Sequence, residues 1–148
     1  CHFHCENASP RYVLLHTFSH LFIRSLAKLC GYQASSLKER IYSTYDGGEK
    51  MAGILIYTAS SDAEGSLGGL VAQAEPGHME ENIDALLDEA EWCSGDPLCM
   101  TSTGANAQGL FGLNYAACHQ CTLLPETSCT MRNLLLDRAN DNAIGFFR

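Results

Sequence analysis

The sequence is poor in positive charge. Nine Lys and Arg stand against seventeen Asp and Glu in 148 residues, which gives a formal net charge of -8. The stretch 61–100 contains ten acidic residues and no Lys or Arg. Such a surface repels phosphate, so we expect the chain alone to bind nucleic acid poorly. The acidic stretch is either a solvated face or a docking face for a basic partner.

Targeting and membrane segments are also missing. No apolar run approaches the ~18 residues that a membrane span requires, and the N-terminus lacks a basic-then-apolar signal peptide. We therefore expect a cytoplasmic protein with no membrane contact. An apolar share of 46% excludes disorder as the main state. Because the chain begins with Cys1, we expect a piece of a longer protein, with one domain over 1–148 and a linker or truncated end over 1–9.

Complete catalytic motifs are absent as well. The sequence has no phosphate-binding G-x-x-x-x-G-K-[ST], no dinucleotide fingerprint, no H-E-x-x-H and no G-x-S-x-G. His16 and His20 are spaced i, i+4, which predicts one helix face. They are either hydrogen-bonded core or interface histidines, or ligands of a metal-dependent nuclease or hydrolase together with Asp62 or Glu64.

The pattern of elements predicts an α+β fold with a small sheet and three or more helices. Ser9 and Pro10 predict the start of a long helix that ends before Gly31. The apolar run 53–58 predicts a buried strand, and periodic apolar residues predict a helix over 77–92 with an acidic outer face. A Ser36-x-x-Glu39 capping box predicts a short helix to about residue 42, and a last helix is expected over 128–140.

Cysteines dominate the C-terminal part of the sequence. Cys118 and Cys121 form a C-x-x-C knuckle, which can present two thiolates to one tetrahedral zinc ion. Cys129, at the start of the expected last helix, can add a third. For the fourth ligand we favour Cys99, because we expect Cys93 to be held in the packing of the acidic helix. His119 is badly placed between two cysteines.

The sequence leaves other interpretations of the cysteines open. Cys118 and Cys121 could form a redox pair, although no strand precedes them. The eight cysteines could also form a disulfide framework, although nothing indicates secretion. Cys30 is expected to be a buried thiol. Cys1 and Cys5, with two nearby histidines, could be half of a second metal site.

Several motifs together resemble a known family, the helicase-associated zinc-binding domain named after the repair helicase MrfA. The version in the DrmB subunit of the DISARM anti-phage system is the most similar in these motifs. They follow in the same order over 16–21, 53–58, 65–70, 92–99, 117–121, 123–129 and 136–139.

This resemblance implies a zinc site, here at Cys99, Cys118, Cys121 and Cys129, and a C-terminal segment stapled by Zn²⁺. It implies a domain that works beside a DNA helicase subunit or domain in bacterial DNA repair or phage defence, and contacts nucleic acid through that complex. It implies no catalytic residue. We therefore expect a non-catalytic accessory domain. The alternatives are the hydrolase that uses His16 and His20, which predicts convergent polar groups, and a zinc-stapled interaction scaffold unrelated to nucleic acid.

Overall fold

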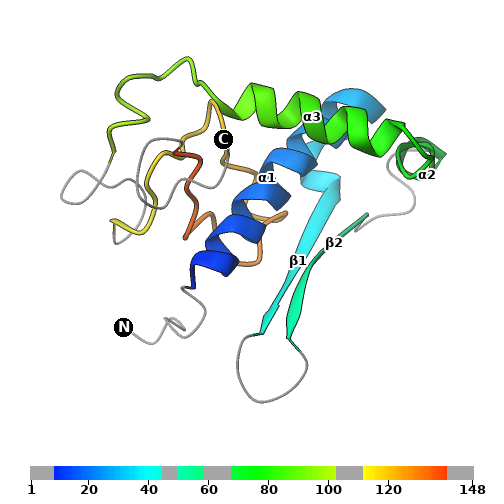
Figure 1. Cartoon of the computed structure of the whole chain (residues 1–148), viewed down its shortest axis with the longest axis horizontal. Helices are drawn as coiled ribbons and strands as arrows, with labels where there is room; N and C mark the ends of the chain where they lie inside the picture. The colour runs from blue at the N-terminus through cyan, green and yellow to red at the C-terminus, as the bar shows by residue number, and fades with distance from the viewer. Residues whose placement is uncertain (1–8, 45–49, 59–67, 103–111, 140–148) are drawn as a thin grey trace.

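The fold is α+β and is built around one long helix. The computed structural model describes residues 9–44, 50–58, 68–102 and 112–139. The elements in chain order are α1 (Pro10–Cys30), the 3₁₀ turn η2 (Ala34–Ser36), β1 (Leu37–Thr44), β2 (Met51–Thr58), α2 (Gly68–Gln73) and α3 (His78–Ala90). The segment 112–139 contains turns and irregular backbone instead of helices (Figure 1).

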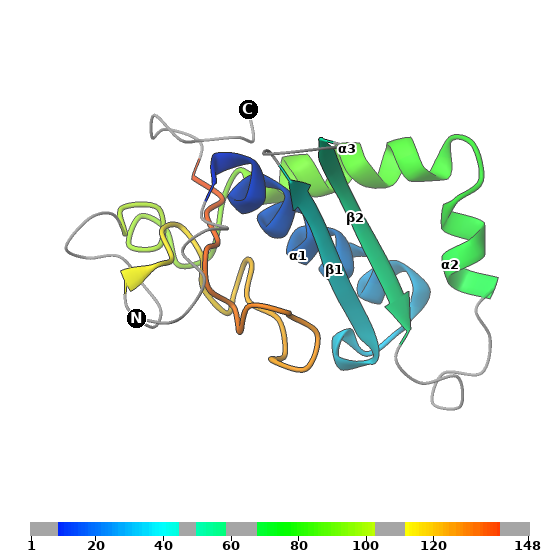
Figure 2. The same ribbon diagram turned by 90° about the horizontal axis from the view of Figure 1, so that it is seen from below.

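Helix α1 forms where its end signals predict it. The Ser9 hydroxyl accepts a hydrogen bond from the Tyr12 N–H at 3.2 Å, and Pro10 occupies the first turn. Gly31 ends the helix with φ 75°, a left-handed conformation that suits glycine. The helix contacts both strands, α2 and α3, so it is central to the described structure (Figure 2).

A β-hairpin replaces the short helix expected after Ser36, and that prediction was wrong. β1 and β2 pair antiparallel with Leu37 opposite Thr58 and Thr44 opposite Met51. The Ser36 hydroxyl donates to the Gln33 carbonyl instead of capping a helix. Glu39 does not complete a capping box, because its side chain points into the interior, where it is 1% exposed.

The predicted strand over 53–58 is present and starts earlier, at Met51. Its expected full burial was wrong. The sheet has only two strands, so one face of β2 lacks a cover within the described structure. Leu55 and Tyr57 are 46% and 43% exposed, respectively.

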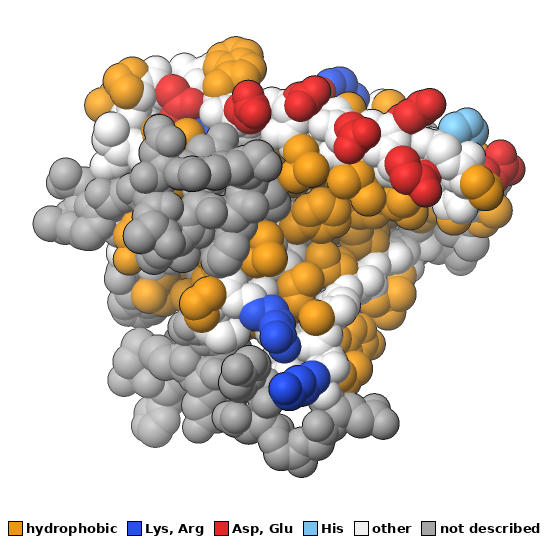
Figure 3. Space-filling model, viewed as in Figure 1, with side chains coloured by type: hydrophobic (Ala, Val, Ile, Leu, Met, Phe, Trp, Pro, Cys, Tyr) orange, Lys and Arg blue, Asp and Glu red, His pale blue; other side chains and the backbone are white. Residues whose placement is uncertain are grey.

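Helix α3 packs its apolar stripe against α1, as its periodicity predicts. Leu86 and Ala90 are buried against Leu21, and Ile83 and Phe18 pack at the edge of this core. The acidic side chains of α3 are exposed, and a row of them lies along the helix (Figure 3); Glu89 also pairs with Lys28 of α1 at 2.6 Å. Both faces of the helix therefore match the sequence pattern.

A second core joins α1 to the hairpin and to the C-terminal segment. Ile23 and Leu26 of α1 are buried with Leu37 of β1 and with Leu124. Gly68 and Gly69 begin α2, which lies close to the end of α1. A Cβ on Gly69 would lie 3.2 Å from Cys30 Cβ, so the close approach is to the end of α1.

The last expected helix does not form, and the prediction for 128–140 was wrong over the described part of that range. Arg132, Asn133 and Leu135 have φ of 52°, 58° and 63°, which a right-handed helix does not accommodate. The Asn133 side chain instead bonds both backbone groups of Leu124, at 3.0 and 2.8 Å. These bonds hold Asn133 against Leu124 in place of a helical turn.

No helix among the described residues is both long and apolar enough to cross a membrane.

Candidate metal centre

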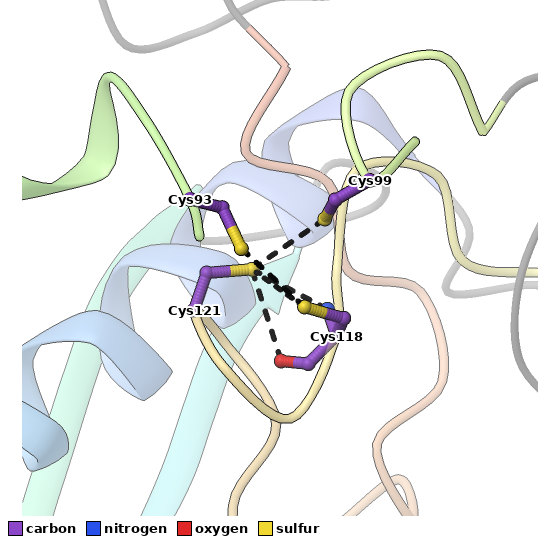
Figure 4. A group of neighbouring side chains, drawn as sticks. All are labelled: Cys93, Cys99, Cys118 and Cys121. Atoms are coloured by element: carbon purple, nitrogen blue, oxygen red, sulfur yellow. Dashed lines mark hydrogen bonds between the residues drawn. The ribbon is translucent and has the colours of Figure 1, made fainter. Parts of the chain in front are cut away.

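Four cysteines from two distant segments converge beside the end of α3. The sulfur atoms of Cys93, Cys99, Cys118 and Cys121 all lie within 4.8 Å of one another (Figure 4). The Sγ–Sγ distance is 3.5 Å for Cys93–Cys118, 3.8 Å for Cys99–Cys121 and 3.7 Å for Cys118–Cys121. No disulfide joins them.

These distances suit a tetrahedral zinc ion. With Zn–S bonds of about 2.3 Å, the edges of a regular tetrahedron of sulfur atoms are about 3.8 Å long. Four thiolates fill the coordination shell of zinc, which is the pattern of structural sites. The donor set and its spacing therefore fit zinc, and they leave no coordination position for a substrate.

The first pair of cysteines brackets a turn held by Asp96. Its carboxylate accepts the Cys93 N–H at 2.6 Å and the Met100 N–H at 3.1 Å. The Gly95 N–H donates to Cys93 Sγ at 3.3 Å. Cys93 lies three residues beyond the end of α3, so packing of the helix fixes one thiol and the Asp96 turn brings Cys99 to it.

The second pair forms a knuckle that α1 holds in place. The Cys118 N–H donates to Cys121 Sγ at 3.4 Å, which turns the two sulfur atoms to the same side. The guanidinium of Arg24 donates to the carbonyls of Gln120 and Leu123 at 2.8 and 3.2 Å. Arg24 therefore binds the outer face of the knuckle to the central helix.

Arg138 supplies a buried positive charge next to the thiols. Its side chain is 0% exposed, and one guanidinium nitrogen contacts both carboxylate oxygens of Asp96 at 2.7 and 2.9 Å. Another nitrogen donates to the Ala90 carbonyl at 3.0 Å. Burial disfavours its charge, but hydrogen bonds to Cys121 and Asp96 raise the pKa of Arg138 above its already high ordinary value. It therefore stays charged and would offset part of the negative charge of four thiolates bound to a metal ion.

The thiols differ in how readily they ionise. Burial opposes ionisation of Cys121, yet hydrogen bonds from the Thr122 hydroxyl and the Cys118 N–H, together with Arg138, lower its pKa to about 7. Burial raises the pKa of Cys93 and of Cys99. Metal binding must therefore displace protons from the buried thiols, as zinc does when it binds cysteine.

The structure brings together three of the four expected ligands. Cys99, Cys118 and Cys121 lie in one group. The fourth member is Cys93, the less favoured alternative to Cys99 in the sequence, and not Cys129. Cys129 lies elsewhere, and the helix that was expected to place it does not exist. The sequence does indicate Cys93 as a partner of Cys99, because the two cysteines flank the turn residues Gly95, Asp96 and Pro97. Cys118 and Cys121 flank the turn of the knuckle in the same way.

Cys129 belongs to a second group with His16, His20 and Glu39. All four are buried, and the two histidines face each other with ring centroids 4.6 Å apart. Burial lowers the pKa of His20 and raises that of Cys129 to about 12. Burial opposes ionisation of Glu39, but the two histidines hold its pKa well below the ordinary value. Glu39 was not predicted as a site residue, because its spacing from Ser36 matches a capping box and so indicates the start of a helix. In the structure it is a strand residue that faces the core.

The remaining candidates do not join either group. Cys30 is half-buried and His119 is exposed on the knuckle. Asp62 and Glu64 lie outside the described residues, as do Cys1 and Cys5 with their neighbouring histidines. The combination of His16 and His20 with Asp62 or Glu64 therefore stays a prediction.

Comparison with known proteins gives two findings. A family model described as the MrfA Zn-binding domain matches residues 18–122, which include all four cysteines of the first group and exclude Cys129. The chain is also 44% identical over 128 residues to the DISARM protein DrmB of Bacillus paralicheniformis. That alignment covers 86% of this chain and 22% of the relative, so the chain spans about a fifth of that protein's length.

Proposed function

Because the chain belongs to the MrfA Zn-binding domain family, we propose that it is a non-catalytic accessory domain of a helicase-type complex in anti-phage defence. The observation that carries this proposal is the 44% identity to DISARM protein DrmB together with the four-cysteine group. The domain would act beside a helicase subunit and meet DNA through it.

Zinc has a structural role in this proposal, with Cys93, Cys99, Cys118 and Cys121 as ligands. When bound, the ion would join the turn after α3 to the knuckle on α1. Structural zinc in small domains contributes on the order of 10–16 kcal/mol at neutral pH. The net stability of a domain is only about 5–15 kcal/mol. Loss of the ion would therefore unfold at least the segment 112–139, which contains no helix of its own.

Two features of the described residues argue against the hydrolase alternative. Four cysteines satisfy a tetrahedral ion and leave no position for a reacting water. His16 and His20 do converge with Glu39, but both histidines are 0% exposed. A substrate cannot reach them without opening the core between α1 and β1.

A partner surface is available along α3. Acidic side chains form a row along this helix (Figure 3). Glu81, Asp84 and Asp88 are exposed on it. Below that row lies an apolar groove, which α1, β2 and α3 form; its lining residues include Phe18, Leu55 and Ile83. An acidic ridge above an apolar groove suits a basic, partly apolar protein surface better than it suits DNA.

The experiment is co-purification of the domain with the products of its neighbouring genes, among which we expect a helicase subunit. We expect a complex that weakens as salt rises, because exposed charges are screened. Reversal of Glu81, Asp84 and Asp88 to Lys should weaken it without unfolding the domain. As a matched pair, Asp84→Lys should weaken it and Glu126→Lys, an exposed reversal on the C-terminal segment, should not. A complex indifferent to all these reversals would contradict the proposed surface.

Two further measurements separate the alternatives. The isolated domain should cleave no DNA and hydrolyse no ATP, and its DNA affinity at physiological salt should be weak. DNA cleavage that disappears in a His16→Ala/His20→Ala variant would support the hydrolase. Absence of any helicase complex, with zinc bound and the fold intact, would support an interaction scaffold unrelated to nucleic acid.

A further inference from the structure

The buried group of His16, His20, Glu39 and Cys129 has the composition of a metal site. Two histidines one turn apart on α1, a carboxylate from β1 and a thiol from the C-terminal segment supply four donor atoms. The exposed fraction is 0% for both histidines, 1% for Glu39 and 8% for Cys129. These four residues come from three separate parts of the chain, which are α1, β1 and the C-terminal segment.

The donor atoms have the spacing of a small tetrahedral shell. His16 Nε2 lies 3.0 Å from Glu39 Oε1 and 3.2 Å from Cys129 Sγ, and His20 Nε2 lies 3.4 Å from Glu39 Oε1. Zinc bonds of about 2.0–2.1 Å to nitrogen and oxygen, and about 2.3 Å to sulfur, give edges of about 3.3–3.6 Å. The three observed distances are within a few tenths of an ångström of these edges.

The hydrogen bonds of His20 leave one of its nitrogens without a partner. His20 Nδ1 lies 3.1 Å from the Thr122 carbonyl, which can only accept, so Nδ1 carries the proton. The lone pair of the neutral ring is then on Nε2, a buried atom that makes no hydrogen bond and faces the Glu39 carboxylate. A lone pair facing a carboxylate is repelled unless a proton or a metal cation lies between them. Orientation of one ring nitrogen by a carbonyl is typical of a metal-binding histidine.

Cys129 is prepared in a similar way. Its sulfur accepts the N–H groups of Met131 and Asn133 at 3.3 and 3.2 Å. Two backbone donors to one sulfur stabilise a thiolate and direct its remaining lone pairs.

The charges balance for a divalent ion. A carboxylate, a thiolate and two neutral imidazoles carry a total charge of −2, which Zn²⁺ cancels. Charge that is buried in the core is costly unless it is compensated. Glu39 Oε2 has no hydrogen-bond partner, which leaves that oxygen free to contact a cation.

We propose a second metal site in which His16, His20, Glu39 and Cys129 bind Zn²⁺. Four protein ligands in the core make it structural. The ion would hold α1, β1 and the C-terminal segment together. Two of its ligands, His16 and Cys129, lie outside residues 18–122, which the family model matches. The two sites together would hold the segment 112–139 at two places, at Cys118 and Cys121 and again at Cys129.

The first test is the metal content of the unaltered 148-residue chain. We expect two zinc ions per chain by elemental analysis. X-ray absorption at the zinc edge should give a mean of roughly two and a half sulfur ligands per zinc, because one site has four and the other one. One zinc in an all-sulfur environment would overturn the proposal, and the group would then be a hydrogen-bonded core cluster. This measurement needs no variant and is independent of whether variants fold.

Variants then assign each ion. Cys129→Ser should lose one zinc and keep the all-sulfur site, whereas Cys30→Ser, a half-buried thiol in neither group, should lose none. Zinc content unchanged in Cys129→Ser would contradict the proposal. If Cys118→Ser keeps all its zinc while Cys129→Ser loses it, the second site stands and the four-cysteine site fails. The two claims are thus separately testable.

Discussion

Replacement of Arg138 by Met tests whether the buried guanidinium supports the four-cysteine site. Met keeps most of the apolar stem but removes the ion pair to Asp96, the bond to the Ala90 carbonyl and the charge beside Cys121. The Asp96 carboxylate then stays at the site, 23% exposed, without its cation. Removing one partner of a buried pair costs about 3–5 kcal/mol.

Arg138→Met should also weaken zinc binding. Groups that contact metal ligands typically change metal affinity by about 10–100-fold when they are removed. The variant should therefore lower the free energy of unfolding by about 3–5 kcal/mol in denaturant titration, and lower zinc affinity about 10–100-fold in competition with a chelator. Asp96→Asn should act in the same direction, since that carboxylate accepts two backbone N–H groups as well as the guanidinium.

The control is Arg40→Met, on the exposed face of β1. Arg40 lies 5.7 Å from the Tyr42 ring, and its loss should cost less than about 1 kcal/mol and leave zinc affinity unchanged. The reasoning is wrong if Arg138→Met resembles Arg40→Met in both assays. A loss of stability with unaltered zinc affinity would show that Arg138 supports the packing alone.

Three further substitutions probe the supports around the centre. Arg24→Ala removes the hydrogen bonds to the carbonyls of His119, Gln120 and Leu123, so zinc release to a chelator should accelerate while the helical circular dichroism stays the same. Leu86→Ala opens the core between α1 and α3 and should cost about 2–5 kcal/mol in denaturant titration. Asn133→Ala leaves both backbone groups of Leu124 without their partner, and should raise hydrogen exchange at Leu124 before elsewhere in the chain.

The helices with local signals could be predicted from the sequence. Ser9, Pro10 and Gly31 fix the ends of α1 through bonds and dihedral angles within a few residues. The stripe of α3 is likewise a property of one short segment. The β-hairpin could not be predicted in the same way. The spacing of Glu39 from Ser36 indicates a helix cap, and its role in the core depends on the contacts with His16 and His20 of α1.

The candidate metal ligands could be predicted only in part for the same reason. Cys118 and Cys121 are placed by their own turn, and the sequence predicts them directly. Cys93 was considered only as the alternative to Cys99, and its place beside the knuckle depends on where α3 ends, which is a tertiary property. Cys129 was expected beside the knuckle because a helix was expected to begin there, and the left-handed backbone at Asn133 excludes that helix.

The zinc content of Cys93→Ser tests the central claim most directly, that Cys93 completes the four-cysteine site. Each protein is purified in parallel with the unaltered chain and with Cys30→Ser, and the zinc per chain is measured by elemental analysis. We expect Cys93→Ser to lose one zinc relative to the unaltered chain and Cys30→Ser to lose none. A Cys93→Ser protein that keeps all of its zinc would contradict the account.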